Sequence, residues 1–558
     1  MPSWEEEDCC NWEGVVCHPT TRHVVKLKLS ECIQDSKGQV HQMINSSLLA
    51  LTELNHLDLS YNHFYNVPIP KFIGSFKKLK YLNLSNSFFI GVPTGIGKLS
   101  NLTSLSLCYN QLQGSVSEIH LENLTRLEVL DLSYNYLKVS FDPNWVPIFQ
   151  LVLVQLSGCE IGPQIPRWLQ LQTRIDTLDL SNNKIAETLP SWLVNVSSST
   201  LTSLHLSGNQ IKGKLPTFSD ASRLINLRLD TNQFEGQLDD LFSCNYSSTQ
   251  LPSSLQNCTY LSYLDLSHNA FSGNIPPWMG ESLQGLQVFR LGYNIFSGDI
   301  PQQLLLLEEL KILDLSNNNF SGSLPYYLGN FTAMASISRS FEFTEYVDLV
   351  IPTKGGNLHY PYKSDLTTSL DFSGNNLTGE IPPEIGRLTG LHNLNLSRNH
   401  LSGKIPQELG EITLLESLDL SFNDLSGTIP NSLADLNFLS YINLSYNNLM
   451  GRIPSGSQLQ TLSDPSRYMG NPRLCGPPVS SGCSVTETVD KVQKMRNFEW
   501  IWLSIAVVLG FLMGIWTFCG ILFFKREWRY AYFRGIDSWY DRILLQLLFC
   551  LARLSGQD

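Results

Sequence analysis

The stretch Leu418-Asp-Leu420-Ser-Phe-Asn423 recurs along the chain with little change, and it decides the fold. Clear copies begin at Leu57, Leu130 and Leu178, and the last copy begins at Ile442. The asparagine position of this phrase occurs fifteen times, at residues 62, 87, 110, 135, 159, 183, 209, 232, 269, 294, 318, 375, 399, 423 and 447. Most of the steps between these positions are 23 to 26 residues, so one structural unit is repeated along the chain.

The spacing within the phrase assigns a place to each residue. The two leucines flank a single residue, so both point inward from a short strand and the residue between them points outward. The asparagine is expected at a bend, where its amide satisfies backbone groups of the neighbouring repeat. Ser87 and Cys159 replace it in two repeats. The sequence therefore predicts an α/β leucine-rich-repeat solenoid, curved, with short parallel strands on its concave face.

Many repeats continue after the strand with a glycine, a β-branched residue and a proline. Examples are Phe271-Ser-Gly-Asn-Ile-Pro276 and Leu401-Ser-Gly-Lys-Ile-Pro406. Glycine followed by proline turns the chain and prevents a long helix on the convex side. This ending resembles the plant-specific class of leucine-rich repeats.

A solenoid needs sealed ends, and both ends carry cysteines. Asp8-Cys9-Cys10-Asn11-Trp12 precedes Cys17 and a degenerate first strand near Val24, and Gly470-Asn471-Pro-Arg-Leu-Cys475 precedes Cys483. Both segments resemble the caps of plant leucine-rich-repeat receptors. The resemblance implies disulfides Cys10–Cys17 and Cys475–Cys483, and implies that Cys9 pairs with a cysteine further upstream.

The chain is expected to work in an oxidising, extracellular compartment, although no secretory signal peptide opens it. We interpret the start as an incomplete cap whose signal peptide is missing; a cytosolic variant is the alternative. Asn-X-Ser/Thr sequons, Asn257 among them, occur along the repeats, and some arise from the Asn-Leu-Ser sequence of the repeat itself. The ten candidate glycosylation sites are Asn45, Asn83, Asn101, Asn123, Asn195, Asn245, Asn330, Asn376, Asn395 and Asn443.

Residues 500–524 carry no charge and are long enough to cross a hydrocarbon core, which needs roughly 20 residues. Lys525, Arg526, Arg529 and Arg534 follow, so the positive-inside rule places the C-terminus in the cytoplasm. We therefore expect a single-pass type I protein of the plasma membrane with its repeats outside.

Two features of this segment and its tail suggest contacts inside the cell membrane or beneath it. Gly510 and Gly514 form a Gly-xxx-Gly motif that lets a second helix approach closely, although glycine is common in membrane helices. In the tail, Tyr540 and Ile543 fit a tyrosine-based endocytic signal. The alternative interpretation is an amphipathic helix over residues 539–554 on the inner leaflet.

The charge distribution disfavours nucleic acid as a partner. The tail of 34 residues carries a net charge of +2, and the whole chain carries −12, so the remainder carries −14. An acidic ectodomain leaves protein and carbohydrate partners open. The tail is also too short for a kinase domain.

Together, the cap cysteines, plant-type repeats, single membrane helix and kinase-less tail resemble a plant leucine-rich-repeat receptor-like protein. The juxtamembrane stretch 525–534 and Asp537-Ser-Trp-Tyr-Asp541 extend the resemblance to receptors for fungal ethylene-inducing xylanase and to disease-resistance receptor-like proteins. The resemblance implies binding of an extracellular protein or peptide ligand. It also implies signalling in plant defence through a leucine-rich-repeat receptor kinase, contacted by the ectodomain and the membrane helix.

Two gaps interrupt the period. The step from Asn232 to Asn269 is 37 residues, which we interpret as a lost repeat. The step from Asn318 to Asn375 is 57 residues and contains an aromatic-rich insertion. This insertion resembles the island segment of receptor-like proteins, which separates the ligand-sensing repeats from the repeats that contact the partner.

The ligand is expected at the middle of the concave face. The outward position between the leucines is Asp or Asn in ten repeats, whereas the middle repeats carry histidine and arginine. Tyrosine and arginine dominate binding hot spots, while neutral drift at a solvated position is the alternative. The candidate ligand-binding residues are His205, Arg228, Asp230, Thr231, His268, Arg290 and Tyr293.

No hydrolase, metalloprotease or phosphate-binding motif is present, and the 11 histidines do not cluster at metal-ligand spacing. We therefore expect no enzyme activity, no cofactor and no metal. Three alternatives to an immune receptor stay open: a developmental peptide co-receptor, an inhibitor of secreted cell-wall hydrolases, and a truncated, non-signalling paralogue.

The sequence thus predicts eight segments. They are a partial N-terminal cap (1–32), leucine-rich repeats (33–330), an island (331–366), the last four repeats (367–452), a C-terminal cap (453–483), a juxtamembrane segment (484–499), a transmembrane helix (500–524) and a cytoplasmic tail (525–558).

Overall fold

The leucines of the repeated phrase build a single parallel sheet. In the computed structural model of the chain, the described residues are 8–30, 44–195, 200–216, 223–237, 259–335, 349–353, 356–360, 367–456, 458–479, 483, 512–514, 530, 534 and 536. The chain divides into the units Met1–Cys483 and Ser484–Asp558, and the repeats lie in the first. Leu418 and Leu420 are fully buried, as are their counterparts in the other repeats.

Seventeen strands form this sheet within the described residues. Each strand pairs in parallel with the strand of the next repeat, except that the first two are antiparallel. In order the strands are β1 (Val15–Cys17), β2 (Val24–Lys28), β3 (His56–Asp58), β4 (Tyr81–Asn83), β5 (Ser104–Ser106), β7 (Val129–Asp131), β9 (Leu153–Gln155), β10 (Thr177–Asp179), β11 (Ser203–His205), β13 (Asn226–Arg228), β15 (Tyr263–Asp265), β17 (Val288–Arg290), β19 (Ile312–Asp314), β23 (Ser369–Asp371), β24 (Asn393–Asn395), β25 (Ser417–Asp419) and β27 (Tyr441–Asn443).

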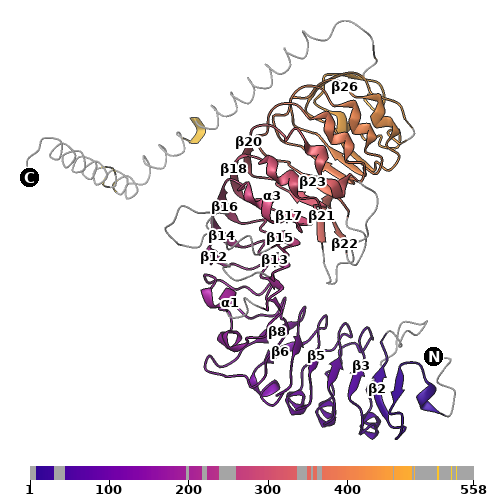
Figure 1. The fold of residues 1–558 in the computed structure, drawn as a ribbon, viewed down its shortest axis with the longest axis vertical. Helices are drawn as coiled ribbons and strands as arrows, with labels where there is room; N and C mark the ends of the chain where they lie inside the picture. Colours follow the sequence, from indigo (N-terminus) through magenta and orange to yellow (C-terminus); the bar gives the residue numbers. More distant parts are fainter. Residues whose placement is uncertain are drawn as a thin grey trace, which may run out of the picture. The chain divides into compact units, whose positions relative to one another are not determined.

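The opposite side of the stack carries short helices and small additional sheets that the sequence did not predict (Figure 1). Two helices of the described part are α-helical, α1 (Ser191–Asn195) and α3 (Trp278–Ser282). One-turn 3₁₀ helices span Cys9–Asn11, Ser46–Ala50, Lys71–Ser75, Thr94–Lys98, Glu118–His120, Arg167–Leu171, Gln302–Leu306, Leu328–Asn330, Thr332–Met334, Pro383–Arg387, Gln407–Glu411, Asn431–Asp435 and Pro465–Tyr468. The additional strands are β6 (Gln113–Val116) with β8 (Tyr136–Val139); β12 (Lys212–Lys214), β14 (Gln233–Gln237), β16 (Ala270–Gly273), β18 (Ile295–Asp299) and β20 (Asn319–Ser321); and β26 (Ser426–Thr428), β28 (Asn448–Arg452) and β29 (Arg473–Cys475).

Proline explains why the helices stay short. Pro406 precedes the helix Gln407–Glu411 and Pro430 precedes Asn431–Asp435, each with extended backbone angles. Each of these helices has five residues, so the convex side of each repeat holds only a short helix. The expected absence of long helices after the Gly-Ile-Pro ending is confirmed for these repeats.

The asparagine of the phrase joins its own repeat to the preceding one, as predicted. The side-chain amide of Asn423 donates to the carbonyl oxygens of Leu396 (2.9 Å) and Leu420 (3.2 Å), and its oxygen accepts from the N–H of Leu401 (2.9 Å). In the variant repeat, the thiol of Cys159 donates to the preceding repeat at 3.2 Å. Asn471 makes the same set of bonds inside the C-terminal cap, which extends the ladder by one position that the repeat count missed.

The two interruptions of the period leave the sheet continuous. Strand β13 pairs directly with β15, and β19 pairs directly with β23. The backbone described within the expected island is an antiparallel hairpin of β21 (Leu349–Thr353) and β22 (Gly356–Tyr360). The inserted residues therefore do not alter the concave face at the level of strand register.

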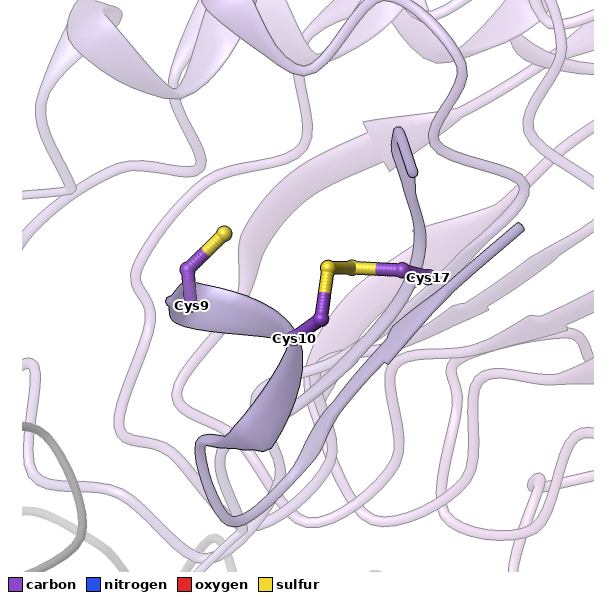
Figure 2. A group of neighbouring side chains, drawn as sticks. All are labelled: Cys9, Cys10 and Cys17. Carbon is purple, nitrogen blue, oxygen red and sulfur yellow. A yellow bond between two sulfur atoms is a disulfide. The ribbon is translucent and has the colours of Figure 1, made fainter. Parts of the chain in front are cut away.

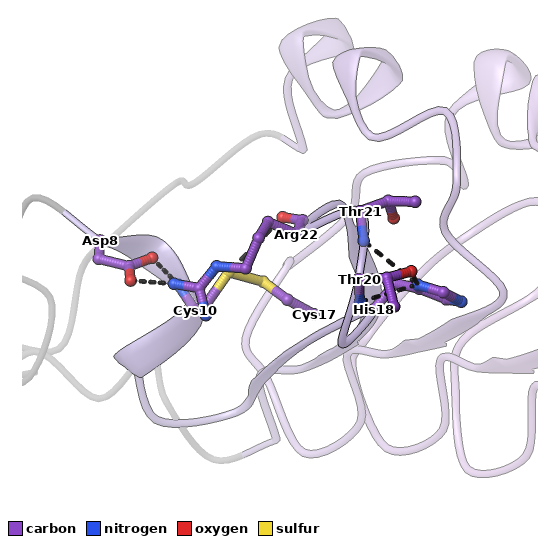
Figure 3. Close-up of a disulfide and its surroundings, with 7 residues drawn as sticks. All are labelled: Asp8, Cys10, Cys17, His18, Thr20, Thr21 and Arg22. Atoms are coloured by element: carbon purple, nitrogen blue, oxygen red, sulfur yellow. Dashed lines mark hydrogen bonds and ion pairs between the residues drawn. A yellow bond between two sulfur atoms is a disulfide. The ribbon is translucent and has the colours of Figure 1, made fainter.

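The caps contain the cysteine pairs that the resemblance implied. Cys10 and Cys17 form a disulfide, and an ion pair between Asp8 and Arg22 lies beside it (Figure 3). Cys9 lies next to this disulfide with a free thiol (Figure 2). At the other end, a second disulfide joins Cys475 and Cys483.

The predicted transmembrane segment 500–524 lies outside the described residues except for 512–514, which are helical. No helix within the described part of the chain is long and apolar enough to cross a membrane. Gly510, Tyr540 and Ile543 also lie outside the described residues, whereas Gly514 lies within the short helical piece.

Candidate ligand-binding hollow

The strand register brings the outward residues of the middle repeats into one row. His205 on β11 lies beside Arg228 on β13, which lies beside Asp265 on β15. The row continues to Arg290 on β17 and then to the aspartates of β19 and β23. Adjacent parallel strands are roughly 4.8 Å apart, so neighbouring members of the row can interact directly.

This row forms the floor of a hollow of about 520 Å³ on the sheet, which we call the central hollow. All seven candidate ligand-binding residues line it, so the structure brings together every residue of that prediction. Its lining residues are Tyr134, Asp179, Ser181, Asn182, His205, Ser207, Arg228, Asp230, Thr231, Tyr263, Asp265, Ser267, His268, Arg290, Tyr293, Asp314, Ser316, Asn317, Asp371, Ser373 and Asn395.

The aspartates of the outward position have a structural role that the sequence interpretation missed. The Asp265 carboxylate accepts hydrogen bonds from the backbone N–H (3.0 Å) and hydroxyl (2.6 Å) of Ser267, two residues on. Asp314 and Ser316 repeat this arrangement, and Asp265 is only 2 % exposed. The aspartate and serine of the Asp-Leu-Ser sequence therefore close a local turn. This turn explains why the sequence recurs, and neither neutral drift nor ligand contact does.

Arg290 belongs to this buried structure more than to the open surface. Its guanidinium nitrogens lie 3.0 Å from Asp265 and 3.4 Å from Asp314, and its side chain is 16 % exposed. Burial opposes the charged form, but the two carboxylates outweigh it and raise the pKa of Arg290 above its usual range. Arg290 therefore neutralises two buried aspartates, and its predicted contact with a ligand stays a prediction.

A glycine makes room for that pairing. A methyl group at Gly292 would lie 2.7 Å from a carboxylate oxygen of Asp314 and 2.9 Å from the hydroxyl of Ser316. Contacts this short do not occur for real side chains, so a larger residue would displace the Asp314 carboxylate. Gly292 stands where most repeats have a serine, and its lack of a side chain leaves space for the Asp314 carboxylate that pairs with Arg290.

Arg228 differs from Arg290 because no carboxylate among the described residues pairs with it. Its guanidinium lies over the Tyr263 ring, 4.3 Å from the centroid, and its Nε is buried without a hydrogen-bond acceptor. The neighbouring His205 has a buried Nε2 that also lacks a partner. Burial, and then the charge of Arg228, hold the pKa of His205 well below its usual range.

Two further carboxyl groups of the hollow are held partly protonated. Burial, and then the charge of Asp265, raise the pKa of Asp230 to about 6. Burial, and then the charge of Asp314, raise the pKa of Asp371 to about 7. Asp314 and Asp371 are partners in the strand register, so their proximity follows from the fold.

The rim of the hollow is formed by the residue that precedes each ladder asparagine. Thr231, His268 and Tyr293 have φ values of 55°, 53° and 56°, in the left-handed region. The His268 and Tyr293 rings stack with centroids 4.1 Å apart, and Tyr293 is 51 % exposed. The same position carries a stacked pair elsewhere, Phe422 with Tyr446, so stacked aromatic pairs recur along this edge of the sheet.

The described residues offer one group of side chains with metal-ligand spacing. Cys9, Cys10 and Cys17 lie together in the N-terminal cap (Figure 2). Two of these sulfurs are joined in the disulfide, so only the Cys9 thiol can bind a metal. The donor set does not fit a structural metal site, which needs several thiolates or imidazoles.

The sequons divide into two groups by position. Asn45, Asn123, Asn330 and Asn376 are exposed and Asn101 is half-buried. Asn83, Asn395 and Asn443 lie on strands of the sheet, and their side-chain oxygens accept hydrogen bonds from the serine two residues on. Asn195 ends α1, with its side chain outside the described part, and Asn245 and Asn257 lie outside the described residues.

Comparison with known proteins identifies the repeats and a set of relatives. Leucine-rich-repeat family models match residues 77–137, 174–196, 197–214, 260–282, 309–331, 367–388, 390–412 and 414–436. The chain is 37 % identical to Receptor-like protein EIX2 of Solanum lycopersicum, over 80 % of this chain and 54 % of that protein. It is 34 % identical to Receptor-like protein EIX1 of the same plant, over 48 % of this chain and 23 % of that protein.

Among solved structures, the chain resembles the leucine-rich-repeat ectodomain of the plant membrane receptor kinase GASSHO1/SCHENGEN3 from Arabidopsis thaliana in complex with CASPARIAN STRIP INTEGRITY FACTOR 2. The identity is 27 % and the TM-score is 0.50, over 79 % of this chain and 55 % of that chain. The chain thus spans about half the length, or less, of the two curated relatives described above.

Proposed function

This chain is a leucine-rich-repeat protein related to the receptor-like proteins of plants, and from that premise we propose that it is a cell-surface receptor for an extracellular protein or peptide. Ligand recognition takes place in the central hollow. Signalling serves plant defence and proceeds through a partner receptor kinase, as the relation to receptor-like proteins suggests.

One observation carries the placement of the ligand. The concave sheet has closed Asp–Ser or Asn–Ser turns in ten repeats of the described part of the chain, but the middle repeats present Arg228, His268 and Tyr293 around a hollow of about 520 Å³. Aromatic and arginine side chains on a rigid sheet provide contact area with little loss of conformational freedom on binding. The hollow is open and polar, so an extended peptide or a protein loop fits it better than a buried apolar molecule.

The membrane attachment is part of the same proposal. The uncharged segment 500–524, followed by basic residues, supports a single-pass type I topology. The two cap disulfides support an extracellular location for the repeats, since disulfides persist in oxidising compartments. We place the contact with the kinase in the last four repeats and the membrane helix, with Gly510 and Gly514 at the helix interface, and internalisation at Tyr540 and Ile543.

The test begins with secretion and ends with binding. The chain is expressed in leaf cells as given and with an added signal peptide, and glycosidase sensitivity shows which form enters the secretory route. The secreted form is then assayed for binding to fungal ethylene-inducing xylanase and to fungal culture proteins.

Paired variants locate the binding site. His268→Ala with Tyr293→Ala removes the stacked rim of the hollow and should weaken binding by about tenfold or more. Phe422→Ala with Tyr446→Ala removes the equivalent stack outside the hollow and should leave the affinity unchanged. Equal losses in both variants would contradict binding at the hollow, and a surface-exposed receptor that binds no fungal protein would contradict the defence role.

A further inference from the structure

The two arginines of the central hollow sit in the same row but have different neighbours. Arg290 lies between Asp265 and Asp314 in the strand register and pairs with both. Arg228 lies between His205 and Asp265. On the strand that precedes Arg290, the register partner is the carboxylate of Asp265. On the strand that precedes Arg228, the register partner is the imidazole of His205.

The carboxylates nearest to Arg228 are already engaged elsewhere. One oxygen of Asp265 accepts from Ser267, and the other pairs with Arg290 at 3.0 Å. Asp230, two residues after Arg228, accepts hydrogen bonds from the hydroxyls of Ser207 and Thr231. Within the described part of the chain, no carboxylate lies within ion-pair distance of Arg228.

The orientation of the Arg228 guanidinium is nonetheless fixed. It lies against the Tyr263 ring, 4.3 Å from the centroid, and Tyr263 is 2 % exposed, so the ring provides a rigid support. Arg228 also lines the central hollow. A half-buried cation that is positioned but has no counter-ion is an uncommon arrangement, because a buried charge is costly without a partner.

We infer that one carboxylate group of the ligand docks against Arg228 and His205, in the place that an aspartate fills beside Arg290. This inference rests on the proposed function, since it names the chemistry of the group that the central hollow recognises. Arginine matches a carboxylate with two parallel N–H donors, and the neighbouring imidazole donates a further hydrogen bond.

The surroundings limit the ligand to a single negative charge at this point. Asp179 on β10 lies beside His205, and Asp230 and Asp265 lie on the other side. These carboxylates repel a doubly charged phosphate more strongly than a carboxylate. An acidic side chain and a peptide C-terminus supply the same group, so both sources are tested.

Binding at this place predicts a dependence on pH with a definite sign. A carboxylate beside His205 opposes the effects of burial and of Arg228, so it raises the pKa of the imidazole. Affinity should then increase as the pH falls towards the pKa of His205 in the complex. Asp179, Asp230, Asp265 and Arg290 are the other charged groups of the hollow near this imidazole, and protonation of Asp230 acts in the same direction.

The experiment is an NMR titration of the full chain in detergent, labelled at the histidine Cε1 positions and assigned with His205→Gln. Three tripeptides are the probes: acetyl-Gly-Glu-Gly-amide, acetyl-Gly-Gly-Gly with a free C-terminus, and acetyl-Gly-Gln-Gly-amide as the neutral control. We expect a saturable shift of the His205 signal with an acidic probe and a rise of its titration midpoint by about one unit. The acidic probe with the higher affinity identifies the source of the carboxylate.

Two variants give the test its control. Arg228→Gln should abolish the response, whereas Arg398→Gln should preserve it, because Arg398 lies over the Phe422 ring in the same manner outside the hollow. A response equal for the neutral probe, no response to either acidic probe, or an unchanged response in Arg228→Gln would overturn the inference. Receptor function is judged separately by fungal protein binding: full binding by Arg228→Gln refutes only the carboxylate site.

Discussion

Replacing Arg290 by glutamine should loosen the middle of the sheet. Its guanidinium compensates Asp265 and Asp314, whose side chains are 3 % and 8 % exposed. Removing one partner of a buried ion pair costs about 3–5 kcal/mol, because the remaining charges stay buried without compensation. We expect a value near 3 kcal/mol, at the lower end, since Arg290 keeps 16 % of its side chain exposed and glutamine still donates one hydrogen bond.

Hydrogen exchange is the appropriate assay, because a solenoid opens locally and a single unfolding free energy does not describe it. A cost near 3 kcal/mol corresponds to roughly 10²-fold faster exchange of the protected amides in β15, β17 and β19. Amides of β3 and β4, many repeats away, should exchange at the original rate.

A matched variant separates burial from charge. Lys184→Gln removes an ion pair with Glu160 whose two side chains are 70 % and 61 % exposed. Exposed pairs contribute little to stability, so exchange near Lys184 should change by at most about fivefold. The buried ion-pair argument would be refuted if Arg290→Gln changed the amide exchange rates in β17 no more than Lys184→Gln changed the exchange rates of amides near Lys184.

Three further predictions test other parts of the molecule. Asn423→Ala leaves three carbonyl oxygens and one N–H without their side-chain partner, so the repeat of Asn423 and the preceding repeat should lose about 2–3 kcal/mol of local stability by hydrogen exchange; exchange unchanged within threefold would contradict the ladder. Asp371 has a pKa raised to about 7, above the value of about 4 in the unfolded chain. Stability should therefore fall as the pH rises from about 4 to about 7. Asp371→Asn should flatten that part of the plot of urea midpoint against pH. Glycopeptide mass spectrometry should find sugar on the exposed Asn330, whereas Asn395, whose amide donates to Asp371 at 3.1 Å, should be unmodified; full occupancy of Asn395 would show that this bond is dispensable.

The sequence predicted the architecture because the repeat carries its own geometry. Leucines at period two and an asparagine every 23 to 26 residues determine the strand, its inner face and the ladder, and the structure confirms each of these. The small sheets on the convex side were not predicted. Their strands, such as Gln233–Gln237, contain glycine and polar residues, and only stacking against the neighbouring repeat makes them strands.

The candidate site was predicted as a set of residues but not in its chemistry. Arg228 and Arg290 occupy the same position of the phrase, so the sequence treats them alike. Their difference lies in the neighbouring strands, where the partner of Arg228 is His205 and the partner of Arg290 is a second aspartate. Pairing depends on which residues are adjacent across 23 to 37 residues of chain, and the position within a repeat does not contain that information.

The position of the hollow follows from where the phrase is broken. In repeats of the hollow that keep the phrase, an aspartate two residues before a serine closes a turn. A carboxylate oxygen of that aspartate accepts the hydrogen bond of the turn. Three middle repeats lack one or both residues of this aspartate–serine pair. Their residues at the two positions are His205 and Ser207, Arg228 and Asp230, and Arg290 and Gly292. Ser207 then turns to Asp230 of the next repeat, and Arg290 takes the aspartates of both neighbours. Among the described residues, Arg228 Nε and His205 Nε2 are left without hydrogen-bond partners, so the repeat's own hydrogen bonding determines which groups the proposed carboxylate site can use.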